Sequence, residues 1–194
     1  MQHLKLLVTA GAVLLLAIVI WISGERRQRR RLRAMAQDVI DALNHVGVKY
    51  WVDFGTLLGI HREGDIIVHD NDIDVCLPSI TDELLECFGT HIVNQGYRFE
   101  AHVWPTISRV YESSGLYTDL YHVALSDDGA VYHGATGSNS DVPADLIGTL
   151  QTIPWTVHGR TVTVSVPENV PGVLEWRYGE DYMKPRRGHK GRDS

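Results

Sequence analysis

Near its start the chain has one uninterrupted apolar run, whereas beyond about residue 34 its apolar residues recur with the periods of helices and strands. Residues 6–22 carry no charged side chain, a length that matches the shortest membrane-spanning helices, about 17 residues. Trp21 lies at the end of this run, where aromatic side chains favour the membrane interface. The pattern predicts a transmembrane anchor over residues 1–24 and a basic juxtamembrane stem over residues 25–34.

A cleaved signal peptide is the alternative interpretation of the same run. Its apolar core would be shorter, about 7–15 residues, and a small-x-small cleavage site would follow. Here Gly24, Glu25 and a series of arginines follow instead, which favours an uncleaved anchor. Lys5 is the only charged residue before the run, whereas several arginines follow it. The positive-inside rule on its own therefore favours a cytosolic side for the following domain, and the side of the membrane stays open.

Beyond the stem, apolar residues recur with a helical period. Met35, Val39, Ile40 and Leu43 lie on one face of a predicted helix, which Gly47 closes as a C-terminal cap. A second helix begins after Ser79 or Thr81 and ends at Gly96, and a third covers residues 170–178. The side chains expected to be buried in the second helix are Leu84, Leu85, Phe88, Ile92 and Val93.

Between these helices the pattern is typical of strands. They are predicted over residues 48–54, 72–77, 97–104, 107–112, 116–125, 130–133, 153–157 and 161–166. A turn at 126–129, a loop over 134–145 and a basic tail over 186–194 complete the chain. The fold class is therefore α+β (mixed α/β), with a central mixed sheet flanked by helices in one folded domain over residues 35–185.

Length and charge limit the classes of function. A chain of 194 residues holds one domain plus an appendage, and its net charge of −6 argues against a nucleic-acid partner. Cys76 and Cys87 are the only cysteines and do not form a Cys-x-x-Cys pair. Neither a disulfide framework nor a structural zinc site is expected.

Acidic residues mark the candidate site. In the predicted strand over residues 72–77, the two-residue period places Asp72 and Asp74 on the same face, with apolar side chains on the other. Asp70 lies just before them. One face enters the core, and the other offers two carboxylates to a hard cation.

Two other interpretations compete with a metal site. Asp70, Asp72 and Asp74 stand at positions one, three and five of a possible EF-hand loop. That loop requires Gly at position six and Glu at position twelve, where this chain has Val75 and Thr81. A solvated acidic turn is the second alternative, and the acids alone do not decide between it and a metal site. Before the acids, a turn at Gly55 and Thr56 lets the backbone approach a phosphate, followed by a helical piece over residues 57–62.

This region resembles the LicD/fukutin family of nucleotidyltransferase-fold phosphotransferases. The family pattern of Gly-Thr-Leu-Leu-Gly, a nearby Arg and Asp-x-Asp-hydrophobic-Asp is matched by residues 55–59, Arg62 and the acids from Asp70 to Asp74. Relatives usually carry Pro-Trp before the first Asp, where this chain has Val68 and His69. Residues 166–185 are similar to the closing element of the family.

The resemblance implies roles for these residues. Asp72 and Asp74 would hold Mg²⁺ (or Mn²⁺), and Asp119, an acid among β-formers, would be the third ligand or the base for an acceptor hydroxyl. Asp70 would orient its neighbours. Gly55, Thr56 and Arg62 would bind the donor phosphate, as would Arg109. For Asp119 an edge position facing water is the alternative, and for Arg109 a plain surface position.

The family also implies a reaction. Its members move a phospho-alcohol, such as phosphocholine or ribitol phosphate, from a CDP-activated alcohol donor onto a glycan acceptor. The alternatives are a nucleotidyltransferase that leaves a nucleoside monophosphate on its acceptor and a catalytically silent scaffold. The predicted location is a single-pass membrane protein, in the Golgi or ER membrane if eukaryotic, otherwise on the cytoplasmic face of the plasma membrane.

Overall fold

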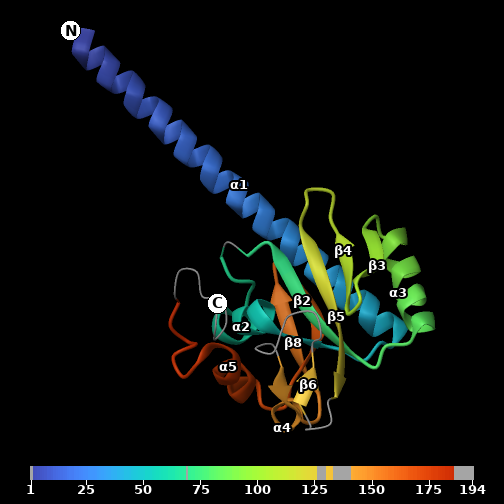
Figure 1. The fold of residues 1–194 in the computed structure, drawn as a ribbon. Helices are drawn as coiled ribbons and strands as arrows, with labels where there is room; N and C mark the ends of the chain where they lie inside the picture. The colour runs from blue at the N-terminus through green and yellow to red at the C-terminus, as the bar shows by residue number, and fades with distance from the viewer. Residues whose placement is uncertain (1, 69, 126–129, 133–140, 186–194) are drawn as a thin grey trace.

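A central sheet with helices packed around it forms the body of the protein (Figure 1). The computed structural model describes residues 2–68, 70–125, 130–132 and 141–185. The helices are α1 (Gln2–Val46), α2 (Phe54–Glu63), α3 (Asp82–Asn94), α4 (Ala144–Ile147) and α5 (Val170–Tyr178). The strands are β1 (Trp51–Val52), β2 (Asp72–Pro78), β3 (Arg98–Trp104), β4 (Ile107–Tyr111), β5 (Tyr117–Leu125), β6 (Ala130–Tyr132), β7 (Val142–Pro143), β8 (Gln151–Val157) and β9 (Arg160–Val166).

The main sheet is mixed, as predicted. Its strand order is β1-β2-β5-β4-β3, and β6 and β7 extend it from β5. The β2 and β5 pair is parallel, whereas the other pairs are antiparallel. Strands β8 and β9 form a separate antiparallel hairpin. The parallel pair determines the site, because it places the acids of β2 directly beside β5.

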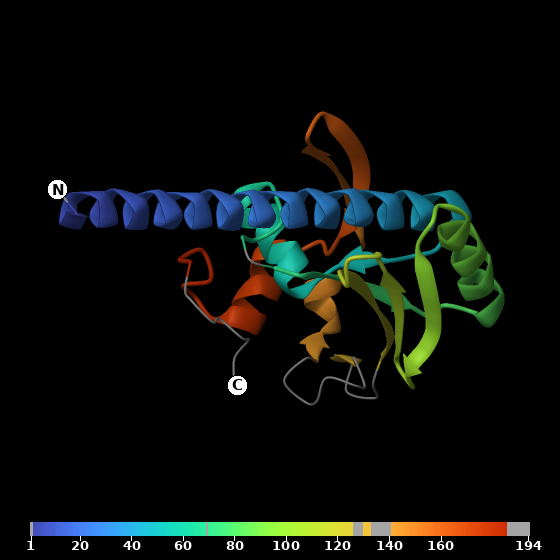
Figure 2. The same ribbon diagram turned by 90° about the horizontal axis from the view of Figure 1, so that it is seen from above.

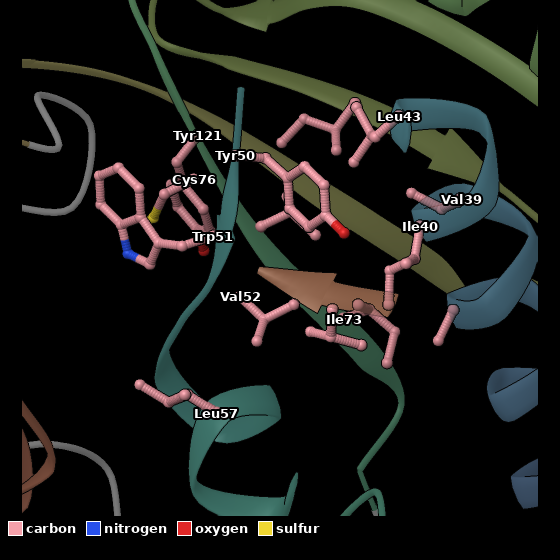
Figure 3. Close-up of a cluster of buried hydrophobic side chains, with 14 of the residues drawn as sticks. Val39, Ile40, Leu43, Tyr50, Trp51, Val52, Leu57, Ile73, Cys76 and Tyr121 are labelled. Carbon is pink, nitrogen blue, oxygen red and sulfur yellow. The ribbon is translucent and has the colours of Figure 1, made fainter. Parts of the chain in front are cut away.

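Helix α1 is one continuous element that joins the predicted stem to the first helix of the domain. Its second half lies in the core, where Leu32, Met35, Val39, Ile40 and Leu43 are fully buried. Figure 3 shows part of this packing, with side chains of α1 facing Tyr50 and others from the sheet. Its first half extends beyond the body of the domain (Figure 2). The second half of α1 is therefore part of the folded domain.

The prediction of a transmembrane helix is not supported. Side chains of residues 2–12, which include the start of the expected span, lie outside the described residues. From Val13 onward the apolar run soon reaches Glu25 and the arginines that follow it. In the described part of the chain no helix has the length and apolar character needed to cross a membrane. This finding overturns the prediction of a single-pass membrane protein.

The predicted strand over residues 48–54 and the turn after it also need correction. The strand is limited to β1, and α2 already begins at Phe54, so that Gly55 and Thr56 lie in its first turn. The cause is Asp53, which takes the N-cap position with extended backbone and accepts a hydrogen bond from the N–H of Phe54. A capping side chain therefore ends the strand early and starts the helix.

Helix α3 begins where it was predicted to begin, but one residue of its predicted buried face is exposed. Thr81 caps it by accepting from the backbone N–H of Leu84. Phe88 and Ile92 are buried, but Val93 is half exposed, because it lies about 100° around the helix from Ile92. The predicted set of buried side chains therefore contained one residue too many.

The second half of the chain follows its predicted order of strands. The hairpin of β8 and β9 and the final helix α5 form where expected. Within the predicted loop over residues 134–145, the described part forms β7 and the start of α4. The predicted turn at 126–129, most of that loop and the basic tail lie outside the described residues.

Candidate active site

The acids of β2 and β5 lie side by side at the centre of the sheet. In the parallel pairing Asp74 is the register partner of Asp119, and Asp72 is the partner of Tyr117. Asp119 is buried, and β5 lies between β2 and β4. The alternative of an edge-strand aspartate facing water is therefore wrong. Three of the four predicted acids come from two adjoining strands.

The start of α2 is packed against these carboxylates. The backbone N–H of Asp74 donates to Thr56 Oγ1 at 2.9 Å. A Cβ atom added to Gly55 would lie 3.1 Å from Oδ2 of Asp70 and 3.9 Å from Oδ2 of Asp74. Glycine thus allows the acids to approach the first turn of the helix, whose free N–H groups favour negative charge. Gly55 was expected to let the backbone approach a phosphate, and in the structure it makes room for the carboxylates of Asp70 and Asp74.

Burial, together with the crowding of like charges, raises the pKa values of three acids. Burial raises the pKa of Asp70 to about 7, helped by the charge of Asp72 and a hydrogen bond with it. Burial also raises the pKa of Asp72, although a hydrogen bond from Tyr117 opposes this effect. For Asp74, burial and then the charges of Asp72 and Asp70 hold the pKa well above its usual value. The cluster therefore binds protons in the absence of another cation.

Arg109 lies on the neighbouring strand and pairs with Asp119. Its Nε donates to Oδ1 at 2.5 Å and its Nη2 to Oδ2 at 3.0 Å, a bidentate arrangement. The guanidinium also lies 4.3 Å from the centre of the Tyr117 ring. The predicted alternative of a plain surface arginine is wrong, because Arg109 is held at the acid cluster.

Arg62 has a different environment from the one that the family resemblance implied. It lies in the last turn of α2, seven residues and about 10 Å along the axis from Gly55. Its guanidinium donates to Glu63 Oε1 at 2.7 Å and, more weakly, to the carbonyl of Tyr182 at 3.4 Å. The structure thus brings the acids, Gly55, Thr56 and Arg109 together but joins Arg62 to the C-terminal segment.

A buried ion pair beneath the site was not predicted. Arg177 of α5 donates to both oxygens of Asp53, each at 2.7 Å, and both residues are almost fully buried. The Nε1 of Trp51 also donates to Asp53, and the guanidinium lies 3.9 Å from the Phe54 ring centre. This cluster fixes the N-cap of α2, and with it the position of Gly55.

Tyr121 is a second contact that the sequence reasoning missed. Its hydroxyl donates to Oδ1 of Asp74 at 3.3 Å. Burial, and then the charge of Asp74, raises the pKa of Tyr121, so the phenol remains a donor. Because Tyr121 lies two residues after Asp119 on β5, strand alternation could have indicated it.

Comparison with known proteins identifies the family. The sequence model described as "LicD/FKTN/FKRP, nucleotidyltransferase domain" matches residues 47–169, more than half of the chain. The chain belongs to the LicD/FKTN/FKRP family. It is 34% identical over 101 residues to human "Ribitol 5-phosphate transferase FKRP" and 33% identical over 101 residues to the mouse protein of that name. Each match covers 47% of this chain and 20% of the relative, so the chain spans about a fifth of the relatives' length.

Solved structures show weaker similarity. The antibiotic-resistance factor ANT(2'')-Ia has a TM-score of 0.47 and 14% identity, covering 73% of this chain and 69% of the other. The lincosamide antibiotic adenylyltransferase LnuA has a TM-score of 0.43 and 20% identity, covering 66% and 75%. No conclusion about mechanism follows from similarities of this size.

The region that matches the LicD family includes the acid cluster but not α5, which carries the buried Arg177. It begins after α1 and ends before α5. Asp53 therefore lies inside the matched region and Arg177 outside it. The buried pair connects the region that matches the family to a helix beyond it.

A divalent cation suits the chemistry of the donor set in this LicD-family site. Asp70, Asp72 and Asp74 are partly buried at a position where their negative charges repel one another, and a cation would relieve this repulsion. Within the described residues, no three His, Cys, Asp or Glu side chains form a complete ligand group. Asp119 holds Arg109 with both oxygens and would have to exchange that partner to become a ligand. The metal and its ligands remain a prediction.

Proposed function

We propose that this chain is a Mg²⁺-dependent phosphotransferase that moves a phospho-alcohol from a CDP-activated donor onto a glycan. The observation that supports it most is the register of the parallel strands, which sets Asp74 beside Asp119. Membership of the LicD/FKTN/FKRP family and relatives named ribitol 5-phosphate transferase favour ribitol phosphate as the transferred group.

Asp72 and Asp74 are the proposed metal ligands, with Asp70 next to them. A bound Mg²⁺ would neutralise the phosphate oxygens of the donor and stabilise the leaving CMP. Thr56 fixes the backbone of Asp74 through its hydroxyl, and Tyr121 orients the carboxylate of Asp74. These contacts reduce the freedom of the ligand before substrate binds, which is the main protein contribution to such reactions.

Asp119 and Arg109 form the other side of the proposed reaction centre. Two hydrogen bonds from Arg109 fix the orientation of the Asp119 carboxyl group. As a carboxylate, Asp119 can accept the proton of an acceptor hydroxyl. When a donor phosphate enters, Arg109 offers it a planar, bidentate partner.

The mass of the product tests this reaction. The protein is incubated with CDP-ribitol, Mg²⁺ and a glycan acceptor, and the acceptor is analysed by mass spectrometry. Phosphotransfer adds ribitol phosphate and releases CMP, whereas nucleotidyl transfer would add CMP to the acceptor. An unchanged acceptor across a panel of CDP-alcohols, with folded protein, would support a silent scaffold instead.

A further inference from the structure

A pocket of about 330 Å³ lies between α1 and the segment that leads into β2. Its lining includes Arg26 and Arg29 from α1, and Val68 and Asp70 from the segment before β2. The volume is at the lower end of the range for small-molecule sites, about 300–1,000 Å³. Asp70 belongs to the acid cluster, so this pocket opens onto the candidate active site.

Ion pairs hold the basic part of α1 in this position. Arg29 donates to the carbonyl of Ile66 at 2.6 Å and lies 3.2 Å from a carboxylate oxygen of Asp65. One turn further on, Arg33 makes two hydrogen bonds to the same carboxylate. The segment that was predicted to be a juxtamembrane stem is instead fixed against the segment that carries Asp70.

The two arginines of the pocket differ in how far they are already paired. Nη2 of Arg29 is bound to Ile66 and Asp65, and its Nε is buried and is one of the side-chain atoms without a hydrogen-bond partner among the described residues. Arg26 is exposed at the pocket. Glu25 also lines the pocket and offsets part of the charge. Two arginine side chains thus line a space that Asp70 also lines, and guanidinium groups bind phosphate oxygens through charge-assisted, often bidentate hydrogen bonds.

We propose that this pocket binds a phosphate group of the substrate, with Arg26 and Arg29 as the residues that contact the phosphate. The proposal rests on the proposed function, because the phosphate would belong either to the diphosphate of the activated donor or to a phosphorylated acceptor. It assigns the role expected of Arg62 to arginines of α1, since Arg62 is paired with Glu63. It also gives the long N-terminal helix a direct part in substrate binding.

Calorimetric titration of the full chain with inorganic pyrophosphate, in the absence of metal, tests the pocket. Arg26→Gln should weaken binding about tenfold, the loss expected for one charge-assisted hydrogen bond. Arg27→Gln is the matched control, because Arg27 carries the same charge on the same helix but does not line the pocket. Arg29→Lys, which keeps the charge but loses the planar group, should also weaken binding.

Two further titrations distinguish the source of the phosphate. If Arg26→Gln weakens binding of CDP-ribitol, the pocket holds the donor, and if it weakens binding only of a phosphorylated sugar that stands for the acceptor, the pocket holds the acceptor. Equal pyrophosphate affinity in the wild type and Arg26→Gln, or no binding by the wild type, would overturn the proposal. CMP release would be intact in that case if the proposed function is correct, so the two failures can be told apart.

Discussion

Asp74 is the residue at which three elements of the site meet. Its backbone N–H is bound by Thr56 of α2, its carboxylate accepts from Tyr121 of β5, and its register partner is Asp119. Each contact restrains a different part of the residue. A carboxylate fixed in this way is ready for a cation without further rearrangement, which is what an electrostatic site requires.

Asp70 gives the metal-free protein a pH-dependent stability. With a folded pKa of about 7, Asp70 keeps a proton that the unfolded chain loses near pH 4. Its contribution to the free energy of unfolding is complete below about pH 4 and is lost as the pH rises through about 7. Asp70→Asn should therefore flatten the stability profile between these values and stabilise the metal-free protein at pH 8 by about 1–2 kcal/mol.

Chemical denaturation in EDTA at several pH values measures this effect. Glu86→Gln serves as the control, because Glu86 is exposed on α3 and the change should leave the profile unchanged. A profile for Asp70→Asn as steep as that of the wild type would contradict the assignment.

The buried pair of Arg177 and Asp53 should dominate the stability of the region below the site. Replacing Arg177 with Met leaves the Asp53 carboxylate buried without its main cation, a change that costs about 3–5 kcal/mol. Glu175→Gln removes a charge from an exposed position on the same helix and should change the free energy of unfolding by less than about 0.5 kcal/mol. Urea denaturation compares the two, and similar small losses would show that the pair is not a structural anchor.

Single residues differ in how far the sequence predicts them. Strand alternation is enough to group Asp72 with Asp74, and a lone acid among β-formers is enough to select Asp119. No such local pattern marks the pair of Asp53 and Arg177, because its partners are 124 residues apart. Their association is a property of the folded chain, and only tertiary packing reveals it.

At the scale of elements, α2 depends on close contact with the segment that follows it. A Cβ atom on Gly59 would lie 2.5 Å from the backbone carbonyl oxygen of Asp65 and 3.0 Å from the backbone nitrogen of Ile67. Backbone atoms cannot move away as a flexible side chain can. The glycine therefore sets the distance between α2 and the segment that leads to Asp70.

Gly59→Ala should consequently destabilise the protein by about 1–3 kcal/mol, despite the higher helix propensity of alanine. Gly24→Ala is the matched control, since a Cβ atom there has nothing within 4 Å and the change should be neutral or stabilising. Thermal unfolding of both variants makes the comparison. Equal melting temperatures would mean that α2 and this segment separate easily.

The elements also show where periodicity is sufficient and where it fails. The strands from β3 to β5 and the hairpin of β8 and β9 form close to their predicted bounds. The start of α2 was predicted too late, because Asp53 acts as a cap inside a segment with high strand propensity. A capping hydrogen bond of this kind overrides propensity and cannot be read from the apolar pattern alone.

At the scale of the whole molecule, the sequence predicted a mixed sheet with helices around it, and this is confirmed. It did not predict that the basic segment of α1 would lie against the domain. Arginines after an apolar run are typical of a membrane stem, but here Arg29 and Arg33 pair with Asp65. Such pairings join residues more than thirty positions apart, and they change a predicted appendage into part of the fold.

The rate of CMP release from CDP-ribitol in the presence of Mg²⁺ and a glycan acceptor tests the central claim most directly. The full chain should release CMP, and Asp74→Asn should reduce the rate by at least about a hundredfold, because the cation would lose a main ligand. Asp82→Asn should release CMP at the wild-type rate. An Asp74→Asn protein that is folded and as active as the wild type would contradict the claim that the acids of β2 and β5 form the reaction centre.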